Sequence, residues 1–193
     1  MKKVLILNGH QYYDVVAKGE LTQSYINKAN NFFLKNGFEV KHTNIEKGYN
    51  IEEECEKFEW ADYILFQYPV YWMSVPWIAK KYIDETFTQG KFYANDGISR
   101  SDETKTYGSG GLLKGKKYML SATINSPVSE FNNSKGFFDG LSFDQAHVAI
   151  HKTFQFCGLE QLETYSVHDI FKGDLDLNAQ LEKFENLLSK NFL

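Results

Sequence analysis

The chain has 193 residues, of which 42% are hydrophobic and 24% are charged, and its formal net charge is −4. This length suits a single domain with a sizeable core, and the lack of a dense basic stripe argues against a nucleic-acid partner. The apolar run at residues 4–7 is too short for a signal peptide or a membrane helix, so the sequence predicts a cytoplasmic protein without membrane insertion.

Strands and helices are expected to alternate along the chain. Apolar or alternating runs predict strands at residues 4–7, 38–43, 61–66, 117–123 and 162–167. Helical spacing of apolar residues predicts helices from Leu21 to the Asn36-Gly37 stop, from an Asn50 cap towards Trp60, over 75–86 and 146–156, and from Asp174 or Asp176 onward. The apolar residues at about 88–115 and 125–145 follow neither helical nor strand spacing, so these segments are expected to be long loops. The whole chain, 1–193, is expected to form one domain.

This alternation predicts an α/β fold. Five parallel strands with right-handed crossovers suit a three-layer flavodoxin-like sandwich, with sheet order 2-1-3-4-5 and helices on both faces. In that order the winding reverses between the first and third strands, and a ligand crevice forms at the reversal. The two loops that flank it are residues 8–22 and 69–77, so both are expected to line one site.

The second of these loops is rich in aromatic residues. It contains Tyr71, Trp72 and Met73 between Pro69 and Pro76. A proline-bounded loop with a flat apolar wall and several backbone N–H groups suits a planar heteroaromatic ring, such as a flavin. The competing interpretation is that Trp72 and Trp77 anchor the loop in the core.

The first of these loops is a candidate phosphate site because it leads into the amino terminus of a helix. Unpaired N–H groups and the helix dipole favour an anion there. Thr22 offers a hydroxyl, Lys18 and His10 offer donors, and Gly19 lets the backbone come close. The alternative is that Thr22 is only an N-cap. The loop lacks the G-x-G-x-x-G dinucleotide fingerprint.

Other motifs carry weaker signals. Residues 110–116 have the glycine and lysine spacing of a Walker A loop, but Lys117 follows where Ser or Thr is required, and the run precedes a strand. His147 and His151 lack the glutamate of a zinc-binding H-E-x-x-H motif, so no metal site is predicted. Cys55 and Cys157 are far apart and are expected to be reduced core thiols.

Several segments resemble the bacterial modulator-of-drug-activity-B family. Those segments are Asn8-Gly9, Gly19-Glu20-Leu21-Thr22, Pro69-Val70-Tyr71-Trp72-Met73, Pro76-Trp77, Lys80-Lys81-Tyr82-Ile83-Asp84, Tyr93-Ala94-Asn95-Asp96-Gly97, Tyr107-Gly108-Ser109-Gly110-Gly111-Leu112 and Gly115-Lys116-Lys117-Tyr118-Met119-Leu120-Ser121. Members of that family are flavodoxin-fold, FAD-containing, NADPH-dependent quinone reductases. The resemblance spans nearly the whole chain.

The resemblance implies a set of FAD-binding residues. They are Ala17, Lys18, Gly19, Glu20, Leu21, Thr22, Gln23 and Ser24 for the diphosphate, Pro69, Val70, Tyr71 and Trp72 for the ring, Thr123, Ile124, Asn125 and Ser126 for a turn closing over the ring, and Tyr107. No proton-handling residue is assigned, because Asp139 stands where a distant mammalian relative has a histidine.

The resemblance also implies a homodimeric NAD(P)H:quinone oxidoreductase. Hydride would pass from NADPH, or from NADH, to the flavin and then to a quinone in a ping-pong sequence. The alternative enzyme is a flavin-dependent azo- or nitroreductase on the same scaffold. The alternative outside enzymes is a flavodoxin-like electron carrier, which typically has an acidic docking face and no roomy substrate pocket.

Overall fold

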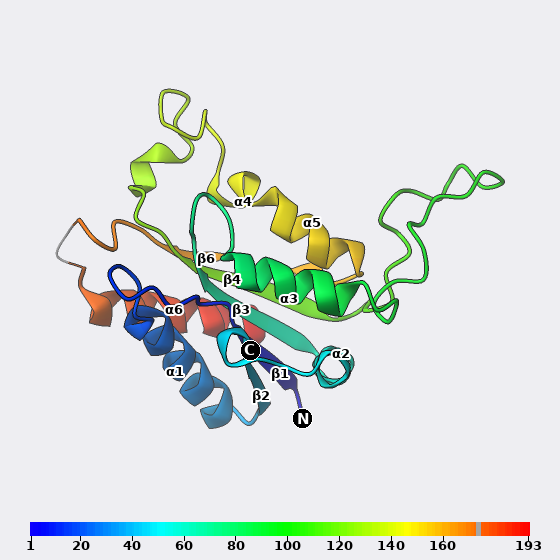
Figure 1. Ribbon diagram of the computed structural model, residues 1–193, viewed down its shortest axis with the longest axis horizontal. Coiled ribbons are helices and arrows are strands. Elements are labelled where there is room, and N and C mark those ends of the chain that lie inside the picture. Colours follow the sequence, from blue (N-terminus) through cyan, green and yellow to red (C-terminus); the bar gives the residue numbers. More distant parts are fainter. Residues whose placement is uncertain (173–174) are drawn as a thin grey trace.

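The computed structural model describes residues 1–172 and 175–193, which fold around one parallel sheet (Figure 1). The strand order is β2-β1-β3-β4-β5, and β6 also pairs with β4. The predicted order of 2-1-3-4-5 is therefore confirmed. The strands are β1 Lys3–Asn8, β2 Glu39–Asn44, β3 Tyr63–Pro69, β4 Lys117–Thr123, β5 Glu160–Gln161 and β6 Tyr165–Val167.

Helices cover both faces of the sheet and make three layers (Figure 1). Apolar residues of α1 and α6 pack on one face, and those of α2, α3 and α5 pack on the other. The helices are α1 Glu20–Lys35, α2 Ile51–Trp60, α3 Trp77–Phe87, α4 Phe143–Ala146, α5 Val148–Phe156 and α6 Leu177–Phe192, with 3₁₀ turns η1 Ile45–Lys47 and η2 Val128–Glu130.

The central strand β1 illustrates why these sequences form a covered sheet. Val4 and Ile6 join the core under α1 and α6, whereas Leu5 and Leu7 join the core under α2, α3 and α5. Because alternate side chains of a strand point to opposite faces, a strand covered on both faces must be apolar throughout. The continuous apolar run predicted as a strand is explained in this way.

The last strand departs from the prediction because it is split. Tyr118 pairs with Gln161 and Ser121 pairs with Tyr165, so two residues of β4 face three on the edge strand. The extra residue is a bulge, which separates β5 from β6. An edge strand accommodates such a bulge because it has no neighbour on its outer side.

The helix predicted over 146–156 begins earlier and is broken in two. Ser142 accepts a hydrogen bond from Gln145 N (3.2 Å), and the Gln145 side chain accepts one from Ser142 N (2.8 Å). This capping box starts α4, which ends at Ala146, and His147 separates α4 from α5. The prediction placed the start of the helix where apolar residues begin to recur at helical spacing, and it did not recognise Ser142 as the N-cap.

Two predicted helix starts can be compared with the structure directly. Asn50 caps α2 by accepting hydrogen bonds from Glu52 N (3.0 Å) and Glu53 N (3.1 Å). Asp176 caps α6 through Ala179 N (3.0 Å), whereas Asp174 lies outside the described residues. The helix expected from Val75 begins at Trp77 instead, directly after Pro76.

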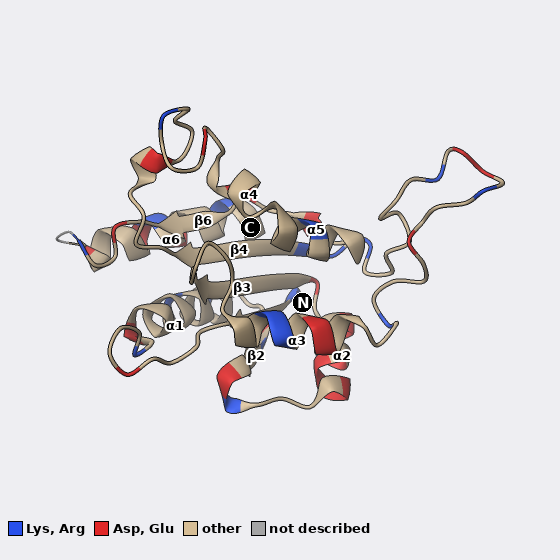
Figure 2. Ribbon diagram, turned by 45° about the horizontal axis from the view of Figure 1, so that its top comes forward, with Lys and Arg blue, Asp and Glu red and all other residues tan. Residues whose placement is uncertain are grey.

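Residues 88–115, called the arm below, contain no helix or strand, as predicted. The arm extends well beyond the sheet (Figure 1) and carries charges of both signs (Figure 2). Its two halves are joined at the base by an isolated bridge between Tyr93 and Gly111, and by hydrogen bonds from Ala94 N to Gly110 O (2.9 Å) and from Leu112 N to Phe92 O (2.8 Å).

Two glycines explain the tight base of the arm. A Cβ atom on Gly110 would lie 2.0 Å from Asn95 O, and one on Gly111 would lie 2.3 Å from the backbone nitrogen of Gly158. Real Cβ atoms do not approach main-chain atoms so closely, so only glycine fits. The glycines of the run that resembles a Walker A loop therefore serve close packing between chain segments.

Both cysteines lie in the core. Burial raises the pKa of the Cys157 thiol to about 12 and also raises the pKa of Cys55. A thiol that stays protonated at neutral pH is a poor nucleophile. Within residues 1–172 and 175–193, no helix has the length and apolar character needed to cross a membrane.

Candidate functional site

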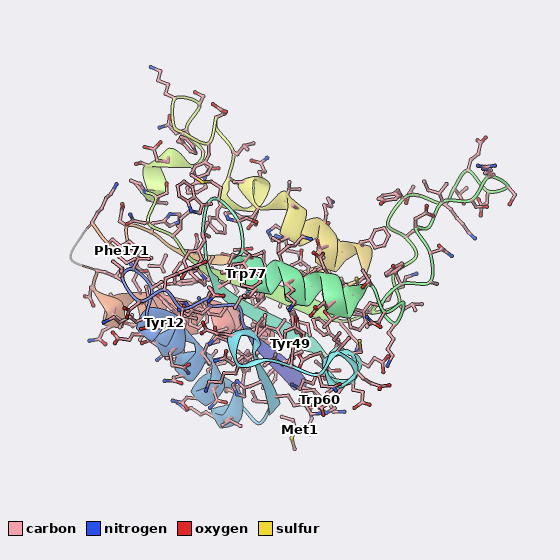
Figure 3. The ribbon with its side chains drawn as sticks, in the orientation of Figure 1. Met1, Tyr12, Tyr49, Trp60, Trp77 and Phe171 are labelled. Carbon is pink, nitrogen blue, oxygen red and sulfur yellow. The ribbon has the colours of Figure 1, made fainter. Side chains whose placement is uncertain are left out.

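A cleft of about 350 Å³ opens at the carboxyl ends of β1, β3 and β4. This is the edge at which ligands bind in open parallel sheets. Figure 3 shows Phe171 and Tyr12, from the β6–α6 and β1–α1 loops, at the same end of the molecule. The cleft is lined by His10, Val15, Val16, Ala17, Lys18, Gly19, Glu20, Leu21, Thr22, Pro69, Val70, Tyr71, Thr123, Asn125, Ile170 and Phe171.

His10 forms the inner wall of the β1–α1 loop. Its Nε2 lies 3.1 Å from Ala17 O, and its backbone N–H donates to Asn8 Oδ1 (3.0 Å). The Nδ1 atom is buried and has no hydrogen-bond partner among the described residues. Burial lowers the pKa of the His10 imidazole, because burial disfavours its charged form. Because a carbonyl oxygen only accepts, Nε2 carries the proton of the neutral ring and Nδ1 is an enclosed acceptor.

Gly19 brings the start of α1 against this histidine. Its φ of 90° lies in the left-handed region, and an added Cβ would lie 3.0 Å from the His10 ring. The first hydrogen bond within the helix is donated by Gln23 N to Gly19 O (2.9 Å). The backbone amides just before Gln23 therefore have no acceptor inside the helix.

Thr22 is a buried residue of the first helical turn and lines the cleft. The N-cap of α1 is Gly19, and no side chain caps the helix. The alternative interpretation of Thr22 as an N-cap is therefore wrong, because the helix starts one residue earlier than predicted, at Glu20. The absence of a side-chain cap leaves the first amides open to a ligand.

The β3–α3 loop forms a tight hairpin turn. Tyr71 N donates to Ser74 O (2.9 Å), and Ser74 N donates to Tyr71 O (3.2 Å). The two residues between them have positive φ, 49° at Trp72 and 64° at Met73, as in a type I′ turn. That turn favours Asn and Gly, so a tryptophan and a methionine at these positions are strained.

The strained turn projects Trp72 into solvent, where its side chain is 95% exposed. Trp77 is also exposed, at 62%. The interpretation that these two tryptophans anchor the loop in the core is therefore wrong. The anchor is Tyr71, whose hydroxyl donates to Gln11 O (2.9 Å) and whose ring meets Tyr13 edge-on at 5.5 Å. Burial raises the pKa of Tyr71 to about 12.

The turn after β4 ties three loops together. Val70 N donates to Thr123 O (2.8 Å), and Ile124 N donates to Val167 O (2.9 Å). The Asn125 side chain accepts a hydrogen bond from Phe171 N (3.0 Å). The β3–α3, β4 and β6–α6 connections are thus held in fixed relation around the cleft.

A second cavity of about 370 Å³, called the side hollow below, adjoins the cleft. Both are lined by Val70 and Asn125. Its far wall comes from the 125–142 segment, where Phe131 stacks on Phe138 with ring centroids 4.1 Å apart. The side hollow is lined by Val70, Trp72, Met73, Ile124, Asn125, Ser126, Pro127, Phe137, Phe138 and Lys172.

The structure brings most of the predicted site residues together. Those in the cleft are Ala17, Lys18, Gly19, Glu20, Leu21, Thr22, Pro69, Val70, Tyr71, Thr123 and Asn125. Trp72, Ile124 and Ser126 line the side hollow instead. Gln23 and Ser24 lie further along α1 and line neither cavity.

Tyr107 is the predicted residue that lies apart from the others. It belongs to the arm, is 71% exposed, and packs against Phe156 with ring centroids 5.5 Å apart. Together with Tyr93 it lines a groove between α3 and α5 rather than the cleft. Within one chain, Tyr107 and the cleft are therefore separate features.

Sequence reasoning missed part of the cleft. Val15 and Val16 lie in the loop at 8–22 that was expected to line the site, but Ile170 and Phe171 were not identified as lining residues. Ile170 and Phe171 follow β6, whose carboxyl end meets the same edge of the sheet as β1, β3 and β4. The rule that ligands bind at this edge could have identified them, because it applies to every loop that follows a strand.

Known proteins resemble this chain in sequence or in fold. Residues 2–190 match a family described by its flavodoxin-like fold. The chain is 40% identical over 188 residues to NADPH:quinone oxidoreductase MdaB of Haemophilus influenzae. The alignment covers 93% of this chain and 97% of that protein.

Solved structures agree on the fold. A protein described as a candidate quinone reductase from Klebsiella pneumoniae has a TM-score of 0.79 at 21% identity, covering 98% of this chain and 85% of that one. An FMN-dependent NADH-azoreductase from Bacillus anthracis, in complex with FMN, has a TM-score of 0.68 at 16% identity, covering 98% and 99%. At these identities the likeness concerns the fold alone.

Proposed function

The chain belongs to the family with the flavodoxin-like fold and, within it, to the modulator-of-drug-activity-B oxidoreductases, and we propose from this premise that it reduces quinones with NAD(P)H on a bound flavin. The observation that carries the proposal is the cleft at the winding reversal, which combines an uncapped helix terminus with a wall formed by Pro69, Val70 and Tyr71. The uncapped helix terminus suits a phosphate, and the wall suits a planar ring.

The residues present fit the phosphate of a flavin. His10 lies on the same wall as Gly19 and Thr22, and because its Nε2–H is directed at Ala17 O it positions the loop rather than donating to a phosphate. Amide N–H groups at the start of α1, the Thr22 hydroxyl and the Lys18 ammonium group would donate to phosphate oxygens. We propose FAD as the flavin, since Ile170 and Phe171 extend the cleft beyond the β1–α1 loop.

Backbone amides would orient the polar edge of the ring. The amides of Val70 and Ile124 already donate within the protein, as does that of Tyr71. Within the described residues, the amides of Asn125 and Ser126 have no such acceptor, so the turn after β4 supplies free donors. A bound flavin supplies the hydride chemistry between the nucleotide and the quinone.

The side hollow would receive the two substrates in turn. It adjoins the cleft and is mostly apolar, so its side chains would shield part of one face of the bound ring from water. NADPH, or NADH, would enter first and leave before the quinone binds, which is the ping-pong sequence. No residue of the chain needs to act as a nucleophile in this scheme.

We also propose a homodimer in which Tyr107 contacts the flavin of the partner chain. Within one chain, Tyr107 lines the groove between α3 and α5, apart from the cleft. Its side chain is 71% exposed beside Phe156, so a second copy can contact it there, next to the arm that extends from the domain (Figure 1). Each site would then combine the cleft of one chain with the arm of the other.

The first prediction is spectroscopic. The purified protein, loaded with FAD if necessary, should be yellow, should bleach on anaerobic addition of NADPH, and should regain its colour when menadione is added. Release of the cofactor by heat and chromatography against FAD and FMN standards identifies the flavin. A protein that binds neither flavin contradicts the whole proposal.

The same assay distinguishes the alternatives. Reduction of an azo dye with a kcat/KM above that for menadione would favour an azoreductase, the activity of the structural relative from Bacillus anthracis. A flavin that bleaches with dithionite but not with NADPH or NADH would indicate an electron carrier. Rapid return of colour with menadione, faster than with oxygen, supports the quinone reductase.

A further inference from the structure

The side hollow has an apolar wall with one charge at its border. Trp72, Met73 and Phe137 are among its apolar lining residues. Of the described residues that line it, Lys172 is the one with a formal charge. Because Lys172 is exposed, water screens its charge, so an ion pair with an anionic ligand in the hollow would be modest in strength.

The segment that carries Lys172 is fixed to the turn after β4. Phe171 N donates to Asn125 Oδ1 (3.0 Å), and His168 Nδ1 lies 3.1 Å from Ser126 O. Lys172 N donates to Asp169 O (3.2 Å), which closes a local turn. Since Asn125 also lines the cleft, the position of Lys172 is set relative to whatever binds there.

We propose that Lys172 is a specificity residue that favours ligands of the side hollow bearing an anionic group. This inference rests on the proposed function, because it assumes that the electron donor and the quinone enter this hollow. Two sources provide the anion: a sulfonate, carboxylate or ionised hydroxyl on the quinone, or the 2′-phosphate that distinguishes NADPH from NADH. The two sources are alternatives, because a quinone substituent lies beside the stacked ring whereas the 2′-phosphate lies at the far end of the nucleotide.

The test compares wild type with Lys172→Gln and with Lys135→Gln. Lys135 is an exposed lysine of the segment that forms the far wall, and it does not line the hollow, so it is a matched control for loss of one surface charge. One arm measures kcat/KM for menadione and for 1,4-naphthoquinone-2-sulfonate. The other measures kcat/KM for NADPH and NADH with menadione. Calorimetric titration with NADP⁺ and with the sulfonate gives dissociation constants independently of turnover.

In one arm of the test, Lys172→Gln should lower the ratio of kcat/KM for the anionic ligand to kcat/KM for its less charged counterpart about fivefold. This is the size expected for a partly exposed ion pair. A change in the sulfonate arm identifies the quinone as the source of the anion, and a change in the nucleotide arm identifies the 2′-phosphate. The effect should shrink at high ionic strength.

Two results would overturn the proposal. One is that Lys172→Gln lowers kcat/KM equally for the charged and the neutral ligands. The other is that Lys135→Gln changes the ratio of kcat/KM values as much as Lys172→Gln does. Failure of the proposed function is a separate outcome: if the wild-type protein reduces no quinone, calorimetric titration of the flavin-loaded protein still reports whether Lys172 discriminates between the ligands.

Discussion

Trp72 and Met73 occupy backbone conformations that cost free energy. Two adjacent non-glycine residues with positive φ are destabilising by roughly 1–2 kcal/mol each. Packing does not compensate at Trp72, because its side chain is 95% exposed. The strain persists where a flat indole borders the side hollow, which is consistent with a ligand-binding role.

Replacing the pair by the residues that the turn favours should separate stability from function. The double variant Trp72→Asn/Met73→Gly is expected to raise the free energy of unfolding of the flavin-free protein by about 1 kcal/mol, because Asn-Gly fits a type I′ turn. The same variant should weaken flavin binding and lower turnover. Chemical denaturation and flavin titration measure the two effects.

The single variants Trp72→Asn and Met73→Gly provide the controls for that experiment. Each should recover part of the stability gain, since each removes one of the two strained residues. A double variant that is less stable than wild type, with flavin affinity unchanged, would show that this turn is a structural element and not a ligand wall.

The sequence predicted which residues directly after β3 lie at the cleft, but it did not predict how exposed the next residues are. Pro69, Val70 and Tyr71 follow an apolar strand, and the carboxyl-end rule places them at the cleft. The direction in which Trp72 points depends on the sign of φ at two consecutive residues. Nothing in the composition of the loop predicts this, because tryptophan and methionine rarely adopt such values.

At the scale of elements, the break between α4 and α5 places a neutral histidine in the interior. His147 stacks on Phe143 with ring centroids 4.0 Å apart, and its Nδ1 lies 2.9 Å from Phe143 O. Its Nε2 has no partner among the described residues. Burial lowers the pKa of His147; the hydrogen bond to Phe143 O opposes this shift, His151 adds to it and Asp144 opposes it.

This burial gives a pH dependence with a definite sign. Below pH 6.5 the unfolded chain protonates His147 while the folded chain keeps it neutral, so stability falls as the pH is lowered until the folded pKa is passed. His147→Gln should reduce the slope of unfolding free energy against pH by up to about 1.4 kcal/mol per pH unit in this range.

Urea denaturation between pH 8 and pH 5 measures this slope. At pH 8 the histidine is neutral in both the folded and the unfolded state. The difference in unfolding free energy between wild type and variant at that pH therefore isolates the loss of packing and serves as the reference. Parallel stability curves for the two proteins over the whole range would contradict the buried neutral state of His147.

The sequence predicted elements better than it predicted their interruptions. The Asn50 cap and the strand order followed from local signals and from the alternation of strands and helices. The bulge between β5 and β6 arises from the pairing of distant residues, Tyr118 with Gln161 and Ser121 with Tyr165. Such register information is not contained in the edge strand itself.

At the scale of the whole molecule, the arm separates Tyr107 from the cleft of its own chain. If each site takes Tyr107 from the partner, two defective chains should complement each other. A dimer of one Tyr107→Ala chain and one Trp72→Ala chain has one site with both aromatic residues intact. In the homodimer of either variant, every site lacks one of them.

Co-expression of the two variants with different tags tests this arrangement. The two homodimers should be nearly inactive, and random pairing should restore about a quarter of wild-type activity per chain, since half of the dimers would hold one intact site out of two. Sedimentation measures the oligomeric state. A monomer, or a mixture no more active than the parent variants, contradicts the proposed exchange of arms.

The close packing within the arm also determines where residues can be inserted into this protein. A Cβ atom on Gly97 would lie 2.6 Å from Thr106 O, so the segment just below the tip admits no added bulk. Beyond it, residues 98–105 make short-range turns, such as Thr104 N to Asp102 Oδ1 (3.1 Å). Natural insertions, epitope tags and fluorescent labels are therefore best tolerated at this tip, which is the part of the arm furthest from the sheet (Figure 1).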